Sequence, residues 1–441
     1  MRKLKNYYQQ HPLITIILSI FSLLIISGLI LPQLPSLAKT QQVQVFEQIW
    51  QRVNDSFFDP KFNGVDWKAI KTKYQPLAAK SKSKQEFSAV INQMLSELKT
   101  SHTYYYTQED QEYYQLLGIF QPRSNSIQQQ IKKFFPKSDI EYEGIGILTR
   151  DINGKIFIRG VLDNSPAQIG GIKVGDEIVN VDGRPYQSVQ SFLGKAGKKV
   201  KILIQSTPDI SSQQEIIVTP KVLNSTKMFL DAQEASVKTI EKENKKIGYI
   251  HIWSYAGDQY QKLLENELIN GRLRDTDSLI LDLRDGWGGA EPNYLNIFTG
   301  TGPSITLLGR DRQPVTLKHQ WKKPVVMLVN KGTRSGKEIL AFGFQQYKIG
   351  KVIGSQTAGA VVAGTAFLMN DGTMLFLAVA DVLVDDKYRL EAKGITPDIN
   401  VPFQLEYAQG KDPQKDKAVE VLLDNPMQHS SKNTSIFHDK E

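Results

Sequence analysis

A buried strand, a tight turn and the start of an apolar helix follow one another in Val325-Val-Met-Leu-Val-Asn-Lys-Gly-Thr-Arg-Ser335-Gly-Lys-Glu338. The local sequence permits two interpretations of Ser335. As a helix cap, Ser335 pairs with Glu338, three residues further on, and satisfies the first helical N–H groups. As a nucleophile at a helix N-terminus, it lies beside backbone amides that stabilise an oxyanion. On this stretch alone, the cap is the more common outcome.

Strand and helix patterns alternate around this stretch. In chain order the candidates are the strand Ile247–Ile252, the helix Gln259–Ile269, the strand Ser278–Leu283, the strand Val325–Asn330, the helix Lys337–Tyr347 and the strand Val352–Gly354. The alternation predicts a sheet covered by helices, which we place at residues 223–408. Asn370-Asp-Gly372, between Thr365–Met369 and Thr373–Ala378, predicts a hairpin. Residues 409–441 form a polar tail with one amphipathic piece around Val419–Leu423, and we expect its end to be disordered.

The segment before residue 143 has a helical pattern. Apolar residues recur at helical spacing from Val43 to Val53 and from Phe87 to Leu98, which predicts a helical domain over residues 41–142. Its last part, residues 120–141, is rich in Gln, Lys and Ser. We interpret that part as a linker or a mobile cover.

The first forty residues carry a targeting pattern. Arg2, Lys3 and Lys5 precede the almost purely aliphatic run Leu13–Leu31, and no charge follows before Lys39. A basic start before an apolar run of this length is typical of a signal peptide or of a membrane-spanning signal anchor. Because the basic end stays in the cytoplasm, we expect the rest of the chain in an extracytoplasmic compartment, such as a periplasm or a lumen.

Composition excludes several classes of protein. The chain has 441 residues, of which 40% are hydrophobic and 23% charged, so a fully disordered chain is excluded. The net charge of +8 is mild and no dense Lys/Arg block occurs, so we expect no nucleic-acid partner. Cysteine is absent and the six histidines are scattered. We therefore expect no disulfide, no thiolate nucleophile, no metal site and no cofactor.

Short apolar strands separated by Gly, Asn and Asp turns follow Gly144. The strand candidates are Ile156–Val161, Val200–Gln205 and Glu215–Thr219. Asn164–Gly183, with the helix start Ser165-Pro-Ala167, resembles a PDZ domain, which we place at residues 143–222. In that resemblance Gly144, Ile145, Gly146 and Ile147 form the loop that holds a peptide's terminal carboxylate, and the peptide adds a strand to the sheet edge. The alternative is a small β-domain with a structural role only.

Two further stretches bear on the role of Ser335. A predicted strand ends in the glycine-rich turn Asp282-Leu-Arg-Asp-Gly-Trp-Gly-Gly289, where paired glycines let the backbone approach a ligand and offer N–H groups to an oxyanion. Ser101-His102 follows the second helical pattern and precedes Tyr104-Tyr-Tyr106. Each stretch also has an ordinary interpretation, as a strand-to-helix turn and as a histidine without a catalytic role.

Together these stretches resemble the C-terminal processing, or tail-specific, serine protease family in its wider sense, which includes the tricorn core protease. The resemblance covers residues 43–425, in the order helical segment, PDZ domain, protease core. Asp282–Gly289 matches the family's Asp-Leu-Arg-x-Asn-x-Gly-Gly turn, with Gly286 in place of the usual Asn, and Ser335 falls on the nucleophile. Lys393–Ile399 matches the family's Gly-x-x-Pro-Asp strand. The resemblance implies a multidomain α+β fold with a core of crotonase-like ββα units.

One position departs from the best-known members of the family. Those members use a Ser–Lys dyad, and where the lysine should stand this chain has Ala360. The tricorn-like branch instead draws its base from a Ser-His pair in the helical segment, supported by a late glutamate. The resemblance therefore implies His102 as the base, with Ser101 and Glu391 supporting it. Other possible bases are Lys331, Lys337 and Lys351.

The resemblance implies an exported serine endopeptidase that cleaves proteins near their C-termini. Neutral His102 takes the proton of Ser335, whose hydroxyl attacks the scissile carbonyl. With an unperturbed pKa of about 6.5, the imidazole should make the rate rise with pH through that value. Amides of Gly288 or Gly289, with Gly336, hold the oxyanion. The implied partners are protein or peptide substrates with free C-termini, and the membrane through the N-terminal run.

Two other functions stay open at this point. The missing lysine also fits a catalytically inactive, PDZ-containing relative that binds peptides without cutting them. Because parts of this family bind hydrophobic small molecules, a binder of that kind is a second alternative. An assay of cutting, with Ser335→Ala and His102→Ala variants, separates the enzyme from both.

Overall fold

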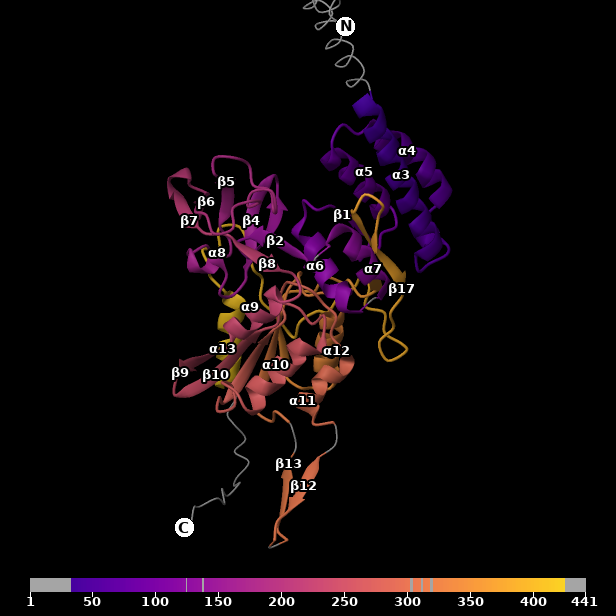
Figure 1. Ribbon diagram of the computed structural model, residues 1–441. Helices are drawn as coiled ribbons and strands as arrows, with labels where there is room; N and C mark the ends of the chain where they lie inside the picture. Colours follow the sequence, from indigo (N-terminus) through magenta and orange to yellow (C-terminus); the bar gives the residue numbers. More distant parts are fainter. Residues whose placement is uncertain are drawn as a thin grey trace, which may run out of the picture.

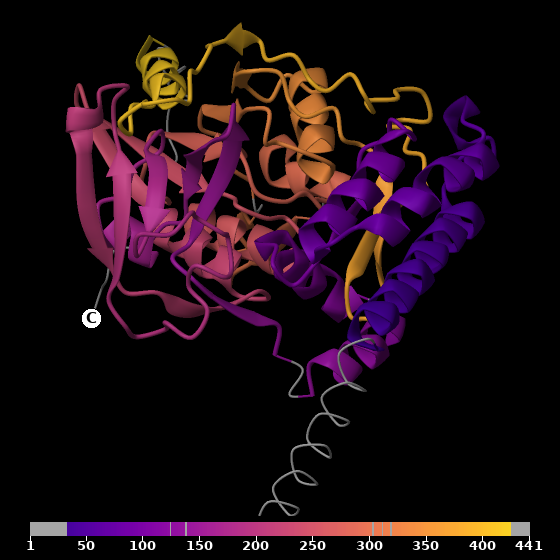
Figure 2. The same ribbon diagram turned by 90° about the horizontal axis from the view of Figure 1, so that it is seen from above.

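The computed structural model describes residues 33–424 except 124, 137–138, 302–303, 311 and 318–319. The predicted mixture of α and β structure is confirmed: a helical N-terminal region, a β-domain and an α/β core follow one another along the chain. The helical region and the β-domain both lie over one end of the core (Figure 1). The view from above shows the N-terminal helices at one side of the molecule and the β-domain at the other (Figure 2).

The N-terminal region begins with three helices. They are α3 (Gln33–Ser56), α4 (Trp67–Lys80) and α5 (Lys84–Ser96), with the 3-10 turn η1 (Phe62–Gly64) between the first two. Asp66 caps α4 by accepting hydrogen bonds from the N–H groups of Lys68 and Ala69, and Ser83 caps α5 in the same way. The apolar faces predicted from helical spacing meet in one buried cluster, which includes Phe46, Ile49 and Ile91.

The segment 120–141 was predicted to be a linker or mobile cover, but most of its described residues belong to a helical unit instead. This unit comprises α6 (Gln111–Phe120), the 3-10 turn η2 (Gln121–Arg123) and α7 (Asn125–Phe134). The prediction was wrong because two apolar residues one helical turn apart, Ile127 and Ile131, suffice to bury one face of α7 among polar neighbours.

A small sheet ties the N-terminal region to the core. Strand β1 (Tyr104–Tyr106) pairs with β17 (Met374–Ala380), which pairs with β16 (Ala363–Leu368). The predicted hairpin is present, but helical periodicity gave no sign of β1. Leu375 and Leu377 of the hairpin are fully buried in the cluster formed by the N-terminal helices. The segment just before β1 is therefore held against the core.

The β-domain contains a five-stranded antiparallel sheet in the order β3-β4-β5-β6-β7. The strands are β3 (Ile147–Ile152), β4 (Lys155–Val161), β5 (Glu177–Val181), β6 (Val200–Gln205) and β7 (Gln213–Val218), followed by the separate pair β2 (Glu141–Gly144) and β8 (Lys221–Asn224). Helix α8 (Pro166–Ile169) begins at the cap Ser165, as predicted. Among the described residues, β3 pairs with β4 alone, so its other edge is open.

The core sheet has six strands in the order β18-β15-β14-β11-β10-β9. They are β9 (Lys238–Lys242), β10 (Lys245–His251), β11 (Ser278–Asp282), β14 (Val325–Val329), β15 (Lys351–Gly354) and β18 (Ile399–Asn400). All neighbours are parallel except β9 and β10. Every residue of β11 and β14 is buried, which explains their continuous apolar sequence. Because β11 and β14 are parallel neighbours, the turns that follow them meet at one edge of the sheet.

Helices cover both faces of this sheet. They are α9 (Met228–Ser236), α10 (Asp258–Ile269), η4 (Pro292–Leu295), α11 (Asn296–Thr299), α12 (Gly336–Gln346) and α13 (Pro413–Asp424). Alternate residues of β11 separate the faces: Ile280 lies in the buried cluster of α13, whereas Leu279 and Leu281 lie in the cluster of α10 and α12. The amphipathic piece predicted near residue 420 is thus the buried face of α13.

A second hairpin and the chain ends complete the description. Strands β12 (Ile305–Leu308) and β13 (Pro314–Leu317) form a hairpin that projects from the core (Figure 1) and that the sequence patterns did not predict. The apolar run Leu13–Leu31 and residues 425–441 lie outside the described residues. Within the part of the chain that the structure describes, none of the helices has the length and hydropathy needed to cross a bilayer.

Candidate active site

Ser335 stands at the junction between β14 and α12. It is the N-cap of α12 and has φ 57° and ψ −131°, a left-handed conformation that is uncommon for a residue with a side chain. The sharp turn works only with a glycine next in the chain, because a Cβ on Gly336 would lie 2.4 Å from the backbone nitrogen of Ala290. Strain of this kind is concentrated at functional sites, which favours the nucleophile interpretation over a simple cap.

Glu338 holds the backbone around Ser335. Its carboxylate accepts a hydrogen bond from the N–H of Ser335 (3.1 Å), the capping contact that the sequence predicted. It also accepts from the hydroxyl of Thr357 (2.5 Å) and from the N–H groups of Gly359 (2.7 Å) and Ala360 (2.8 Å). The segment that carries Ala360 therefore lies beside Ser335, but it offers the site a methyl group in place of an amine.

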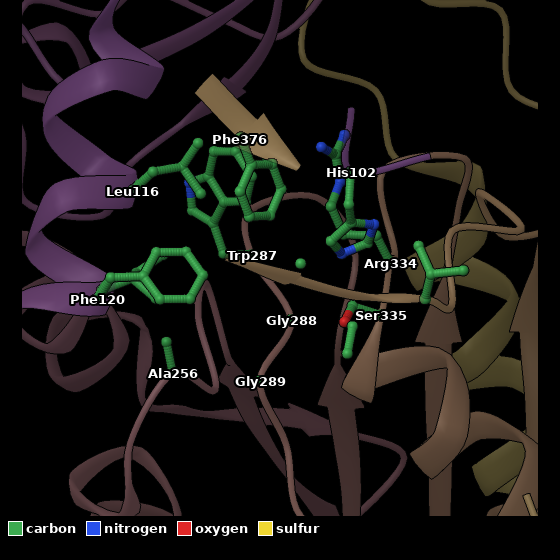
Figure 3. A pocket seen from close by; sticks show the side chains of 14 residues that line it. His102, Leu116, Phe120, Ala256, Trp287, Gly288, Gly289, Arg334, Ser335 and Phe376 are labelled. Atoms are coloured by element: carbon green, nitrogen blue, oxygen red, sulfur yellow. The ribbon is translucent and has the colours of Figure 1, made fainter. Parts of the chain in front are cut away.

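His102 reaches the same cavity from the N-terminal region. Figure 3 shows its imidazole above the side chain of Ser335, with both directed into a cavity of about 180 Å³. Gly364 of β16 backs the histidine so closely that a Cβ there would lie 2.9 Å from the Cβ of His102. The pairing of β1 with β17, two residues further along the chain, thus fixes where this ring lies.

A hydrogen-bonded series runs from His102 to Glu391. Nδ1 of His102 lies 2.9 Å from the hydroxyl oxygen of Ser101, and that hydroxyl donates to Oε2 of Glu391 at 3.0 Å. Glu391 is buried and also accepts from the N–H groups of Ser101 (2.9 Å) and Val361 (2.6 Å). Because the Ser101 hydroxyl donates its proton to the carboxylate, it accepts one from Nδ1. The Nε2 lone pair of His102 is then available as a base.

The environment of His102 favours its neutral form. Burial, and then the positive charge of Arg334, lower the pKa of His102 from its ordinary 6.5 to about 4. The ring is therefore neutral at physiological pH. The sequence led us to expect that His102 titrates near its unperturbed pKa of about 6.5, and the structure does not support that value. The sequence could not show that the imidazole is buried beside Arg334.

The glycine-rich turn after β11 lies directly against Ser335. A Cβ on Gly288 would lie 2.5 Å from the Cβ of Ser335, so only glycine permits the approach. Gly286 has φ +69°, and a Cβ there would lie 1.8 Å from the carbonyl oxygen of Trp253, which explains a glycine where the family has Asn. Among the described residues, the N–H groups of Gly288, Gly289 and Gly336 have no acceptor. These donors remain available to an oxyanion.

Lys337 supports this turn from behind. Its side chain is fully buried, and Nζ donates to the carbonyl oxygen of Asp285 at 2.8 Å. Burial lowers the pKa of Lys337 to about 7. The amine thus points at the back of the turn and does not line the Ser335 cavity. This position does not suit the role of base, which the sequence left open for Lys337. Lys331 and Lys351 are exposed and do not line the cavity.

The β-domain contacts the same turn through an ion pair. Arg159 of β4 pairs with the carboxylate of Asp285, and Asn330 donates to that carboxylate at 2.9 Å. The loop predicted to hold a peptide carboxylate does not line the Ser335 cavity. In it, the side chains of Ile145 and Ile147 are buried in the β-domain core, while Gly144 ends β2 and Gly146 has φ +77°. The sequence gave no sign of the contact between Arg159 and Asp285.

Apolar side chains form the remaining walls of the cavity. They come from α6, the glycine-rich turn, the segment before β16, and β17: Leu116, Ile119, Phe120, Trp287, Val362 and Phe376. Such walls suit an apolar substrate side chain. Sequence patterns identified none of them, because their apolar character resembles that of core residues. Among the described residues, no group of three or more His, Asp or Glu side chains is placed to hold a metal ion.

Comparison with known proteins agrees with this arrangement of domains. Three family models match: the tricorn protease C1 domain over residues 39–96, the PDZ domain over residues 135–205, and peptidase family S41 over residues 246–401. The PDZ match begins before residue 143, where the sequence patterns placed the start of that domain.

Individual relatives match over most of the chain at low identity. The tricorn protease homolog 2 of Streptomyces coelicolor is 24% identical over 410 residues, covering 86% of this chain and 32% of the relative. The carboxy-terminal processing protease CtpA of Bacillus subtilis is 28% identical over 290 residues, covering 62% of this chain and 59% of the relative. A solved photosystem II D1 C-terminal processing protease aligns with a TM-score of 0.49 and 18% identity, covering 84% of this chain and 98% of that one.

The chain spans less than two thirds of the length of either of the two curated relatives. The sequence resemblance to the C-terminal processing proteases, with a tricorn-type N-terminal segment, is confirmed. The chain is therefore similar to the C-terminal processing proteases, and its residues 246–401 match the model of peptidase family S41, after a match to the PDZ domain at residues 135–205.

Proposed function

We propose that this chain is an exported serine endopeptidase that cleaves proteins near their C-termini, with Ser335 as nucleophile and His102 as base. One observation carries the proposal. The hydrogen-bonded series of Glu391, Ser101 and His102 ends at the cavity into which Ser335 projects. A base oriented by a third group is the arrangement by which proteins activate a serine hydroxyl.

The reaction is acyl transfer in two steps. Nε2 of His102 takes the proton of Ser335 as its hydroxyl oxygen attacks the scissile carbonyl, and the resulting imidazolium returns that proton to the leaving amine. Water, deprotonated by the same imidazole, then releases the acyl group from Ser335. Ser101 and Glu391 are positioning residues, since they hold the ring in the tautomer that leaves Nε2 free.

The amides of Gly288, Gly289 and Gly336 are the proposed donors to the oxyanion. They belong to the two turns that meet beside Ser335, and their N–H groups have no acceptor among the described residues. Loss of one such donor typically lowers turnover by about 10²–10³-fold. The close fit of Gly288 against Ser335 means that Gly288→Ala should move the turn and cause a loss of this size.

The β-domain is the proposed receptor for the substrate's tail. The open edge of β3 and the loop from Gly144 to Ile147 supply what strand addition of a peptide requires. Export rests on the basic start and apolar run at the N-terminus, which we propose to act as a signal peptide or as an anchor to the membrane. The occupant of the site is then an extracytoplasmic protein with a free C-terminus.

Cleavage of an unstructured peptide with an apolar C-terminus tests the proposal. We expect the purified full chain to cut the peptide and the Ser335→Ala and His102→Ala variants to lose at least about 10³-fold in kcat. Glu391→Gln should lose less, because it weakens the positioning of the ring without removing the base. Binding without cutting by all forms would identify an inactive peptide-binding relative. Activity that survives His102→Ala but not Ser335→Ala would assign the base to another residue.

A further inference from the structure

Arg334, immediately before Ser335, carries a guanidinium with no partner. Among the residues that the structure describes, none forms an ion pair or a hydrogen bond with it, and its Nε is buried and unsatisfied. The group lies over the ring of Trp287, 5.3 Å from its centroid, and beside His102 (Figure 3). A partly buried cation that lacks an ion pair still loses part of its hydration, which is costly. Such a group is retained where a ligand supplies the missing anion.

The position of Arg334 joins two cavities. It lines the catalytic cavity together with Ser335 and His102, and it lines a second, more polar cavity of about 240 Å³. Trp287 also borders both. The other charged side chains that line the second cavity are Asp110, Glu112 and Arg159. A peptide held at Ser335 can therefore extend past Trp287 into a polar space that contains the unpaired guanidinium.

We infer that Arg334 is a substrate-binding residue that receives a carboxylate of the bound peptide in this second cavity. The planar guanidinium matches a carboxylate with two parallel N–H···O bonds. Its stacking on Trp287 orients it before the ligand arrives. The inference rests on the proposed function and adds to it a specificity determinant outside the β-domain. A peptide whose terminal carboxylate lies at Arg334 leaves the loop from Gly144 to Ile147 empty, so for that peptide the contact replaces capture of the terminus by the β-domain.

The acidic residues of the second cavity do not fill this role themselves. Asp110 already accepts hydrogen bonds from the N–H (2.8 Å) and the hydroxyl (3.0 Å) of Thr107. Burial raises the pKa of Glu112. Arg159, the other cation, is paired with Asp285. Among the described residues that line this cavity, Arg334 is thus the cation that no carboxylate pairs with.

The shared walls limit where the carboxylate lies along the peptide. An extended residue spans at most about 3.3–3.6 Å, and the second cavity begins at the side chains that border the catalytic one. The carboxylate is then close in the peptide to the scissile bond, because Arg334 and Trp287 border both cavities. If it is the terminal carboxylate, the released product is an amino acid or a very short peptide. An acidic side chain near the cleaved bond offers the same chemistry.

Three peptides derived from one parent sequence test the inference on the full chain. The first ends in a free carboxylate, the second in an amide, and the third in an amide with a glutamate placed beside the scissile bond. For the wild type we expect amidation to raise KM about 10- to 100-fold, the effect of losing a charge-assisted hydrogen bond. In Arg334→Gln, the acid and amide peptides should share that raised KM with little change in kcat.

Controls separate this role from a structural one. Arg334→Lys should recover part of the preference for the carboxylate, and Arg274→Gln, at an exposed site, should behave as the wild type. If the third peptide restores the low KM, the carboxylate comes from a side chain, and if it does not, from the terminus. Equal KM values for all three peptides in the wild type would overturn the inference. So would an Arg334→Gln variant that lowers kcat equally for the acid and the amide.

A binding measurement keeps this inference distinct from the proposed function. In the Ser335→Ala background, fluorescence anisotropy of labelled peptides reports affinity without turnover. Tighter binding of the acid than of the amide, abolished by Arg334→Gln, supports the carboxylate site even if the wild type cuts nothing. A wild type that cuts peptides but binds the acid and the amide equally would leave the protease proposal standing and remove the role of Arg334.

Discussion

At the scale of single residues, the site depends on side chains whose environment changes their ordinary behaviour. Ser335 has a left-handed backbone, and His102 and Lys337 both have lowered pKa values. For both His102 and Lys337, burial is the largest cause of the lowered pKa, because the protonated, charged form loses its hydration. The positive charge of Arg334 adds to the effect on both.

The lowered pKa of His102 predicts that activity is lost only at low pH. Only the neutral imidazole is a base, so kcat/KM should rise with pH through about 4 and stay flat from about pH 5.5 to 8. Rates measured from pH 3.5 to 8, with circular dichroism to verify folding, check this. A midpoint near 6.5 would contradict the environment described for His102. Arg334→Gln removes a nearby positive charge and should move the midpoint upward.

The buried amine of Lys337 predicts a stability that depends on pH. Its pKa is about 7 in the folded chain, against about 10.4 when unfolded. Between these values the unfolded state binds one more proton, so stability rises with pH. Relative to Lys337→Met, the wild type should gain up to about 1.4 kcal/mol per pH unit from pH 7 to 10. Urea denaturation of both forms at pH 7, 8 and 9 measures the slope, and parallel curves would refute the prediction.

At the scale of elements, the carboxylate of Glu338 connects the start of α12 to the segment at residues 357–360. Glu338 is fully buried in the first turn of α12 and binds both the turn at Ser335 and the segment at residues 357–360. A carboxylate near a helix N-terminus also benefits from the helix dipole. The capping contact and the nucleophile are thus compatible, although the sequence presented them as alternatives.

Removal of this carboxylate should damage stability and catalysis together. Glu338→Ala leaves several buried N–H groups without an acceptor, which we expect to cost about 3 kcal/mol. The turn at Ser335 would relax, so kcat should fall by about 10²-fold or more. Glu338→Gln retains the shape and one acceptor and should lose less. Thermal denaturation and single-turnover kinetics test this prediction. A Glu338→Ala variant with unchanged kcat would show that the turn at Ser335 keeps its conformation without the carboxylate.

At the scale of the whole molecule, the site is assembled from parts that are distant in the sequence. The N-terminal region contributes His102, held by the pairing of Tyr104 with Phe376. The core contributes Ser335 and the glycine-rich turn, and the β-domain contributes Arg159, which pairs with Asp285 in that turn. The β-domain is therefore in direct contact with the proposed oxyanion donors.

This contact predicts that the β-domain affects the chemical step. Arg159→Met leaves the carboxylate of Asp285 without its ion pair, and a shift of about 1 Å in the turn can cost about 10²-fold in rate. We expect kcat to fall by about 10- to 100-fold. Peptide affinity measured on the isolated binding step should change little. The matched control is Arg150→Met, an exposed arginine of the same domain. Equal kcat for Arg159→Met and the wild type would show that the pair is not needed for alignment.

The sequence by itself determined the features that depend on neighbours in the chain. Apolar runs predicted β11 and β14, helical spacing predicted α10 and α12, and Asn370-Asp-Gly372 predicted the hairpin of β16 and β17. The strand–turn–helix pattern at Ser335 and the family motifs also located the nucleophile candidate. Such features are local, because backbone conformation and side-chain periodicity follow from residues a few positions apart.

Only the tertiary structure decided which distant groups meet. The helix α7 appeared where polarity suggested a linker, because two buried isoleucines outweigh their polar neighbours. The neighbours of His102, the direction of Lys337 and the pairing of Arg159 with Asp285 depend on contacts across long stretches of chain. Burial and charge set by such contacts shift pKa values, and they leave Arg334 without an ion pair among the residues that the structure describes. No pattern of adjacent residues encodes them, since they arise only when separate elements pack together.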